Sequence, residues 1–410
     1  MIESEISVLG AGPAGATAAL FLSNAGVKCT LIDKSPFPRD KVCGDCLGGY
    51  AISVLRQLGD DIFTRFTGFE KKIDGLGVRF FSPGLHQLSV KATNMVNGVI
   101  HEFALCRRND FDNFLFEEAA NRNEISIHTG IEVYGFRKSD EYLVFQDRDK
   151  KDLLKTKLAI VATGSQSRIA GELSSYKNPK KNLAGGIRAY YRNIKESGSD
   201  NFIEFHFLKE ILPGYLWIFP LGDSYFNVGI GQRSDVISQK KTDLRKILPF
   251  LIDSYPYLKD RFENAEMISP PAGFPLALGS AKRSISGDNF LLAGDAASLI
   301  EPFFGEGIGN AMYSGKFAAE QAIRCMEQNE FSSVFNRSYD RNVYRKVGGA
   351  LKMSTYLQKA AFHPWLIDRV FRNIEKKPVL EQLLTRIING DIAREPGLAF
   401  QFLVRSVAGI

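Results

Sequence analysis

Short apolar runs alternate with helical patterns along the first third of the chain. Residues 6–9 and 29–32 are apolar and predict two buried strands, and residues 14–24 between them predict a helix of small side chains. Residues 111–121 have apolar positions at helical spacing, and residues 158–161 predict a further buried strand. Strands that alternate with helices in this way are typical of an α/β fold with a parallel sheet.

The middle of the chain follows another pattern. Aromatic and β-branched residues gather at 189–191, 202–207, 215–219 and 225–230, which predicts an antiparallel sheet. Residues 290–297 return to the parallel-strand pattern, and the last eighty residues are helical and basic. We therefore expect a discontinuous first domain of residues 1–70, 101–168 and 281–330. A second, antiparallel-sheet domain would comprise 71–100 and 169–280, followed by a C-terminal helical region, 331–410.

Composition narrows the class of protein. With 410 residues, 44% of them hydrophobic and 24% charged, the chain can bury more than one globular core. Its net charge of +6 is small and scattered, which argues against a nucleic-acid partner. Residues 1–5 are acidic and leave no room for a signal peptide, and no apolar run is long enough to span a membrane. We expect a cytoplasmic protein.

Three glycines stand between the first predicted strand and helix, spaced as Gly10-x-Gly12-x-x-Gly15. In a strand–turn–helix of this kind the first glycine permits the turn, the second leaves room for a pyrophosphate, and the third lets the helix pack closely. The helix N-terminus, at Ala14, would face the phosphates. Asp33 ends the second strand, where an acid commonly holds ribose hydroxyls. The pattern predicts dinucleotide binding.

A Cys43-x-x-Cys46 pair follows in an irregular, proline-containing loop. Zinc would need a second Cys or His pair, which the sequence lacks, so we expect no metal. A redox pair and two buried small residues both remain open. Five cysteines, an odd number, do not indicate a disulfide framework. The strand at 158–161 runs into Ala-Thr-Gly164, a turn that is common beneath bound nucleotides.

Three separated motifs resemble the flavoprotein superfamily built like p-hydroxybenzoate hydroxylase. They are the glycine turn, the later Gly294-Asp295, and the helix start near Gly307-Ile308. The resemblance implies FAD as cofactor, with Asp295 on its ribityl chain and the helix N-terminus directed at the flavin pyrimidine. Beyond the turn and Asp33, the implied cofactor contacts are Ala14, Cys43, Gly44, Arg108, Val133, Gly164, Asp295, Gly307 and Ile308.

Within that superfamily the chain most resembles the geranylgeranyl reductase family. Residues 38–44 are similar to its cysteine-bearing loop, and residues 302–307, Pro-Phe-Phe-Gly-Glu-Gly, to its stretch over the flavin. Residues 215–220, Tyr-Leu-Trp-Ile-Phe-Pro, and Gly229-Ile-Gly231 are similar to its substrate signature. Strand alternation puts Tyr215, Trp217 and Phe219 on one face, either as a wall for a prenyl chain or as sheet core. The resemblance implies that Tyr215, Trp217, Phe219, Gly229 and Gly231 contact the substrate.

The resemblance implies an enzyme that reduces carbon–carbon double bonds of an isoprenoid or similar apolar substrate with reduced FAD. Cys43 is the candidate proton donor that the motifs place near the flavin. The alternative is a flavin monooxygenase or halogenase acting on an aromatic or polyketide substrate, and a third reading is an electron carrier. Because no second dinucleotide turn is present, NAD(P)H or another reduced carrier would bind transiently. The substrate, the donor and the oligomeric state stay open.

The C-terminal region mixes cations with apolar residues. Such a mixture could dock at the inner face of an anionic membrane, or it could close the back of the substrate lobe with a solvated basic face. The residues concerned are Arg372, Lys376, Lys377, Arg386, Arg394 and Arg405, with Phe371, Leu383, Phe400, Phe402 and Val404.

Overall fold

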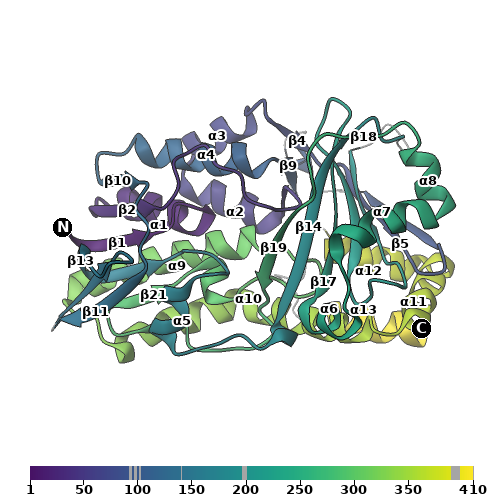
Figure 1. The fold of residues 1–410 in the computed structure, drawn as a ribbon. Helices are drawn as coiled ribbons and strands as arrows, with labels where there is room; N and C mark the ends of the chain where they lie inside the picture. The colour runs from purple at the N-terminus through teal and green to yellow at the C-terminus, as the bar shows by residue number, and fades with distance from the viewer. Residues whose placement is uncertain are drawn as a thin grey trace.

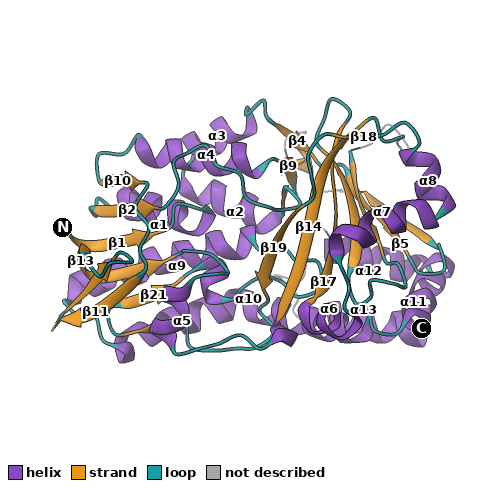
Figure 2. Cartoon of the chain, viewed as in Figure 1, coloured by secondary structure: helices purple, strands orange, loops and turns teal. Residues whose placement is uncertain are grey.

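Two large β-sheets, each covered by helices, form the two lobes of the chain (Figure 1). The computed structural model describes every residue except 92–94, 97–98, 101–102, 140, 196–200, 389–397 and 410. The lobe with the N-terminus holds the sheet with a parallel centre, and the other lobe holds a long, mainly antiparallel sheet above the C-terminal helices (Figure 2). The predicted fold class is confirmed.

The first sheet has the strand order β10–β2–β1–β13–β12–β11, with β21 beside the carboxyl half of β13 and β20 beside β21. Residues 6–9 and the whole of β2 are buried, because a parallel sheet is covered on both faces. The parallel strands end at the same edge, which faces the second lobe (Figure 2). The strands are β1 (Ile2–Leu9), β2 (Cys29–Asp33), β10 (Ile125–Thr129), β11 (Gly135–Ser139), β12 (Tyr142–Gln146), β13 (Asp152–Val161), β20 (Ser286–Gly287) and β21 (Phe290–Leu292).

Two helices rich in small residues, α1 and α9, pack together against this sheet. A Cβ on Gly315 of α9 would lie 2.1 Å from the Ala14 carbonyl oxygen, and one on Gly15 of α1 would lie 1.8 Å from the Gly10 carbonyl oxygen. Glycine is therefore required at both positions. The helices of this lobe are α1 (Pro13–Asn24), α2 (Gly49–Leu58), α3 (Asp60–Thr67), α4 (Arg108–Ala120), α5 (Arg168–Ser174) and α9 (Ile308–Gln328), followed by the long α10 (Ser333–Ala360).

The second sheet has the order β18–β14–β17–β16–β15–β5–β6, with β19 also on β14. All its neighbouring strands are antiparallel except β15 and β5. A small sheet, β3–β9–β4, and a hairpin of β7 and β8 accompany it. The strands are β3 (Cys46–Leu47), β4 (Lys72–Asp74), β5 (Gly77–Phe81), β6 (Gln87–Lys91), β7 (Met95–Val96), β8 (Val99–Ile100), β9 (Ala104–Cys106), β14 (Leu183–Arg192), β15 (Phe202–His206), β16 (Tyr215–Pro220), β17 (Tyr225–Arg233), β18 (Glu266–Met267) and β19 (Ala272–Ala277).

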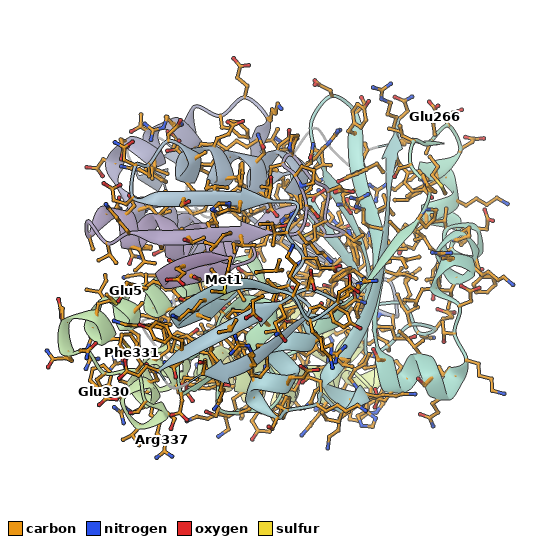
Figure 3. All side chains as sticks on the ribbon, turned by 60° about the vertical axis from the view of Figure 1, so that its left-hand side comes forward. Met1, Glu5, Glu266, Glu330, Phe331 and Arg337 are labelled. Carbon is orange, nitrogen blue, oxygen red and sulfur yellow. The ribbon has the colours of Figure 1, made fainter. Side chains whose placement is uncertain are left out.

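Each face of the second sheet has its own core. On one face α7 (Leu244–Ser254) and α8 (Pro256–Phe262) pack, and α6 (Ser234–Lys240) lies nearby. The other face carries a second apolar core that α11 (Pro364–Lys376) and α12 (Pro378–Ile388) share with α13 (Leu398–Ala408). Figure 3 places Glu266 on β18 at the far end of this lobe, away from Glu330 and Phe331 at the turn between α9 and α10.

None of the helices in the described residues is long and apolar enough to cross a bilayer.

Candidate active site

The predicted dinucleotide turn lies at the carboxyl end of β1. Gly10 has φ +99°, and its N–H donates to the Ile32 carbonyl at 2.6 Å. Asp33 closes the turn by accepting from the Ala11 N–H at 2.8 Å. A Cβ on Gly12 would meet only the Arg39 guanidinium, at 3.4 Å, so bare backbone at the α1 N-terminus faces a cation. This arrangement suits a pyrophosphate.

Asp295 lies just beyond β21, within the short 3₁₀ turn Gly294–Ala297. Its carboxylate is 2.9 Å from the Lys41 ammonium and 3.5 Å from the point where Gly307 would carry a Cβ. Gly307 is the N-cap of α9, and no side chain caps that helix. An acceptor for ribityl hydroxyls and an uncapped helix N-terminus therefore lie together, which fits the flavin end of FAD.

A cavity of about 570 Å³ begins at this flavin end and extends under the second sheet. Pro13, Cys43, Arg108, Asp295 and Gly307 line its end in the first lobe. The rest of the wall is mostly apolar and comes from one face of the sheet and from the helices below it. Sheet residues in this wall include Val78, Phe80, Leu88, Ile203, Phe205, Phe207, Tyr215, Trp217 and Phe219, and helix residues include Met353, Leu357, Leu366, Ile367, Val370, Phe371, Ile374, Leu384 and Phe402.

Strand register explains why Phe80, Phe205 and Trp217 lie side by side in the cavity wall, which we call the aromatic wall together with Tyr215 and Phe219. Phe80 of β5 lies opposite Phe205 of β15, and Phe205 lies opposite Trp217 of β16. Trp217 in turn lies opposite Gly229 of β17, where a Cβ would meet the indole at 2.2 Å. Gly229 thus makes room for Trp217 and does not line the cavity, whereas Gly231 does.

The loop that carries Cys43 presses against this wall. A Cβ on Gly44 would lie 3.0 Å from the Phe219 ring, so only glycine fits without displacing the ring. Arg108 of α4 is buried, grips Asp112 with two hydrogen bonds of 2.7 and 2.8 Å, and also interacts with the Cys43 side chain. Cys43 therefore lies between the cofactor site and the aromatic wall.

A buried polar network fixes the same loop to the sheet. The Trp217 indole N–H donates to Asn227 at 2.8 Å, and the Asn227 amide donates to the Cys43 carbonyl and to Asp45, both at 2.7 Å. Asp45 also accepts from the Tyr190 hydroxyl at 2.8 Å. Burial raises the pKa of Asp45 to about 6, although these hydrogen bonds oppose the shift.

Two carboxyl groups that the sequence analysis did not single out line the cavity, Glu301 and Glu306. Glu301 accepts from the Phe303 N–H at 3.0 Å and from Ser354. Burial raises the pKa of Glu306 to about 7, with the nearby Glu301 adding to the shift. The motif Pro-Phe-Phe-Gly-Glu-Gly contains Glu306, but nothing in its pattern sets this carboxyl apart from a surface acid.

Comparisons with known proteins agree with this site. Residues 3–205 match an FAD binding domain, and residues 185–272 match a geranylgeranyl reductase catalytic domain. A digeranylgeranylglycerophospholipid reductase of Methanococcus vannielii is 31% identical over 366 residues, 87% of each chain. The chain belongs to the geranylgeranyl reductase family. It is an FAD-dependent oxidoreductase, as the motifs predict.

Other relatives and solved structures widen the comparison. A menaquinone reductase of Mycolicibacterium smegmatis is 28% identical over 334 residues, 78% of this chain and 76% of the relative. The geranylgeranyl bacteriochlorophyll reductase-like protein of Thermoplasma acidophilum superposes with a TM-score of 0.80 at 21% identity, covering 98% of this chain and 100% of that one. A flavin-dependent brominase has the same fold, with a TM-score of 0.74, 18% identity, and coverage of 98% and 97%.

The structure divides the predicted site residues into two groups. The cavity wall contains Cys43, Gly44, Arg108, Asp295, Gly307, Ile308, Tyr215, Trp217, Phe219 and Gly231. The other predicted residues lie outside this cavity. Gly10, Gly12, Asp33 and Gly164 follow or end β1, β2 and β13, Ala14 and Gly15 lie in the first turn of α1, and Val133 lies on the loop after β10. Such a separation suits an extended cofactor with an adenosine end and a flavin end.

The structure also gives the state of Cys43 and Cys46 and the exposure of the C-terminal residues that the sequence singled out. Cys43 and Cys46 are free thiols, and burial holds the pKa of Cys46 well above its usual range. Within the described residues, no cluster of His, Cys, Asp or Glu could hold a metal ion. Phe371 and Leu383 are buried, whereas Arg372, Lys376 and Lys377 are exposed. Arg394 lies outside the described residues, as does the side chain of Phe400.

Proposed function

We propose that this enzyme reduces carbon–carbon double bonds of an isoprenoid chain, such as a geranylgeranyl group. The observation that supports this function best is the long apolar cavity, which begins beside Asp295 and Gly307 and ends among the C-terminal helices. When bound, reduced FAD supplies the hydride. The digeranylgeranylglycerophospholipid reductases among the relatives support the same substrate class.

The chain's own residues would bind and orient the substrate. Tyr215, Trp217 and Phe219 form the wall nearest Cys43 and would hold a double bond against the flavin end of the cavity. An isolated alkene accepts hydride poorly, so fixed position and exclusion of water would supply much of the rate. The apolar wall favours both. We propose that NAD(P)H or another reduced carrier replenishes the electrons transiently.

A flavin halogenase or monooxygenase is the second candidate, because halogenase structures share this fold. The two functions differ in their need for oxygen. Protein whose flavin has been reduced chemically would be mixed with geranylgeraniol without oxygen, and the flavin absorbance and the products would be followed. A reductase reoxidises its flavin and saturates the chain under these conditions. Reoxidation only after oxygen is admitted, with a hydroxylated or halogenated product, would contradict the proposal.

We also propose that the junction of α10 and α11 touches the inner face of an anionic membrane while substrate enters. Trp365 is 62% exposed and Phe362 39% exposed, and their neighbours Leu366 and Ala361 line the cavity. Tyr356, with Lys359 over its ring at 5.8 Å, extends the exposed surface. Aromatic rings at headgroup depth beside lysines suit such contact.

Flotation with phosphatidylglycerol vesicles tests this membrane contact. We expect binding at low salt, loss of binding at high salt, and weaker binding for Trp365→Ala. Val334→Ala is the matched control, because Val334 is 71% exposed at the opposite end of α10. Equal binding by both variants, or no binding at low salt, would contradict the contact.

A further inference from the structure

Reduction of a double bond consumes a hydride and a proton, so the cavity needs a Brønsted acid. Ionisable groups in its wall are few, and most of them are held in place by partners. Asp295 pairs with Lys41, Arg108 with Asp112, and Glu301 accepts from the N–H groups of Phe303 and Phe304. The Tyr215 hydroxyl donates to the Phe304 carbonyl, and burial holds the pKa of Cys46 well above its usual range. Cys43 and Glu306 remain to be weighed as proton donors.

Glu306 directs its carboxyl group into the gap between two helix starts. A Cβ on Gly48, the N-cap of α2, would lie 2.4 Å from Glu306 Oε1. A Cβ on Gly309, in the first turn of α9, would lie 3.1 Å from the same atom. Glycine at both positions leaves space for the carboxyl group, and Gly48 itself lines the cavity. Glu306 is therefore held at the flavin end, one residue before the α9 N-cap.

The surroundings of Glu306 keep a proton available there. Its side chain is exposed, but it lines the cavity. Across the described residues no side chain donates a hydrogen bond to its carboxyl group, and no cation pairs with it. The titratable groups that face it are Glu301 from its own loop, Cys46 from β3 and Tyr50 from α2. A second acid and two neutral groups oppose ionisation.

We propose that Glu306 is the acid that protonates the double bond during reduction. This inference rests on the proposed reductase function. In the step, the π bond of the alkene breaks, one carbon gains the hydride and the other gains the Glu306 proton. Glu306 is left as a carboxylate and regains a proton from water, so the protein is unchanged after one turnover. Cys43, which faces the Arg108 guanidinium, would then bind and orient rather than donate.

Infrared spectra of the FAD-loaded protein test the protonation state without substrate. Burial and Glu301 raise the pKa of Glu306 to about 7, so a protonated-carboxyl C=O band should disappear as the pH rises from 5 to 9. Asp45, whose pKa burial raises to about 6, titrates in the same range. The Glu306 band is therefore the part of the signal that is missing in Glu306→Gln and retained in Glu266→Gln, a matched substitution at an exposed position on β18 (Figure 3). A titrating signal of equal amplitude in wild type and Glu306→Gln would assign all of it to other carboxyl groups and overturn the proposal.

Single turnover then tests the transfer. Chemically reduced enzyme is mixed with geranylgeraniol without oxygen, and flavin reoxidation is timed. We expect Glu306→Gln to slow this step about 100-fold or more, Glu306→Asp to recover part of the rate, and the wild-type rate to fall above about pH 7. FAD content and the flavin midpoint potential should stay at wild-type values in both variants.

The outcomes separate the two hypotheses. A Glu306→Gln rate within threefold of wild type, or loss of the rate in Cys43→Ala alone, would overturn the role of Glu306 while leaving a reductase. No reoxidation by wild-type protein would instead count against the proposed function. In that case the infrared titration still decides whether Glu306 holds a proton.

Discussion

Asn227 connects Trp217 in the cavity wall to the loop that carries Cys43 and Asp45. Its replacement should therefore lower the free energy of unfolding. Asn227→Leu keeps roughly the same volume but deletes three hydrogen bonds of 2.7–2.8 Å, to Trp217, to the Cys43 carbonyl and to Asp45. Trp217 is 9% exposed and Asp45 is fully buried, so water cannot readily replace the lost partner.

The size of the effect follows from which groups lose their partner. The Trp217 N–H would be buried without an acceptor, which costs about 1–3 kcal/mol. Asp45 would keep its hydrogen bonds from the Tyr190 hydroxyl and the Arg108 N–H, so it would lose only part of its hydrogen bonding. Cys43 is half-buried and lines the cavity, so water can replace the lost partner of its carbonyl. We expect the free energy of unfolding to fall by about 2–5 kcal/mol.

Urea unfolding of the FAD-loaded protein, followed by circular dichroism, measures this change. Asn113→Leu is the control, because the Asn113 amide donates to Glu117 on the surface of α4 and its loss should change stability by about 0.5 kcal/mol or less. The fluorescence of Trp217 should also shift in Asn227→Leu. A loss below about 1 kcal/mol with unchanged fluorescence would refute the bracing role of Asn227.

Three further perturbations test other parts of the molecule. Gly12→Val should lower FAD content at least tenfold without unfolding the apoprotein, since a side chain there meets only Arg39; normal flavin absorbance would contradict the assignment of the turn. Burial raises the pKa of Asp45 from 3.8 to about 6, so the folded state binds this proton more tightly than the unfolded state. Between pH 4 and 7 the free energy of unfolding of wild type should therefore fall by about 3 kcal/mol relative to that of Asp45→Asn. A difference between the two proteins that does not change with pH would refute this. Trp217→Ala should weaken binding of long prenyl chains more than short ones, at about 0.8 kcal/mol for each methylene that leaves the wall; an unchanged chain-length preference, measured by KM, would contradict the wall.

The features that sequence predicts well are those set by local rules. The glycine turn needs Gly10 at φ +99° and a glycine at 15, so its spacing is readable without a structure. Strand alternation likewise predicts that Tyr215, Trp217 and Phe219 share a face, and all three line one cavity.

Long-range packing accounts for what the sequence could not supply. Asp45 reads as a loop residue, and only folding brings Asn227, 182 positions away, within 2.7 Å of it. Glu306 reads as a surface acid, because its place beside Gly48, the N-cap of α2, and near Glu301 arises only in the folded chain. Gly229 was predicted to touch substrate from its motif, but register places it beneath the Trp217 indole.

The chain order of the first lobe has a consequence for synthesis. Its sheet begins with β1 and β2 but gains β21 only after residue 289, when the whole second sheet has been made. Asp295 and α9 arrive later still, and α1 packs against α9. A nascent chain that already displays the glycine turn therefore lacks both the helix that covers α1 and the flavin end of the site. Cofactor capture must therefore await the synthesis of Asp295 and α9, and a ribosome that stalls within the second lobe leaves α1 without its covering helix.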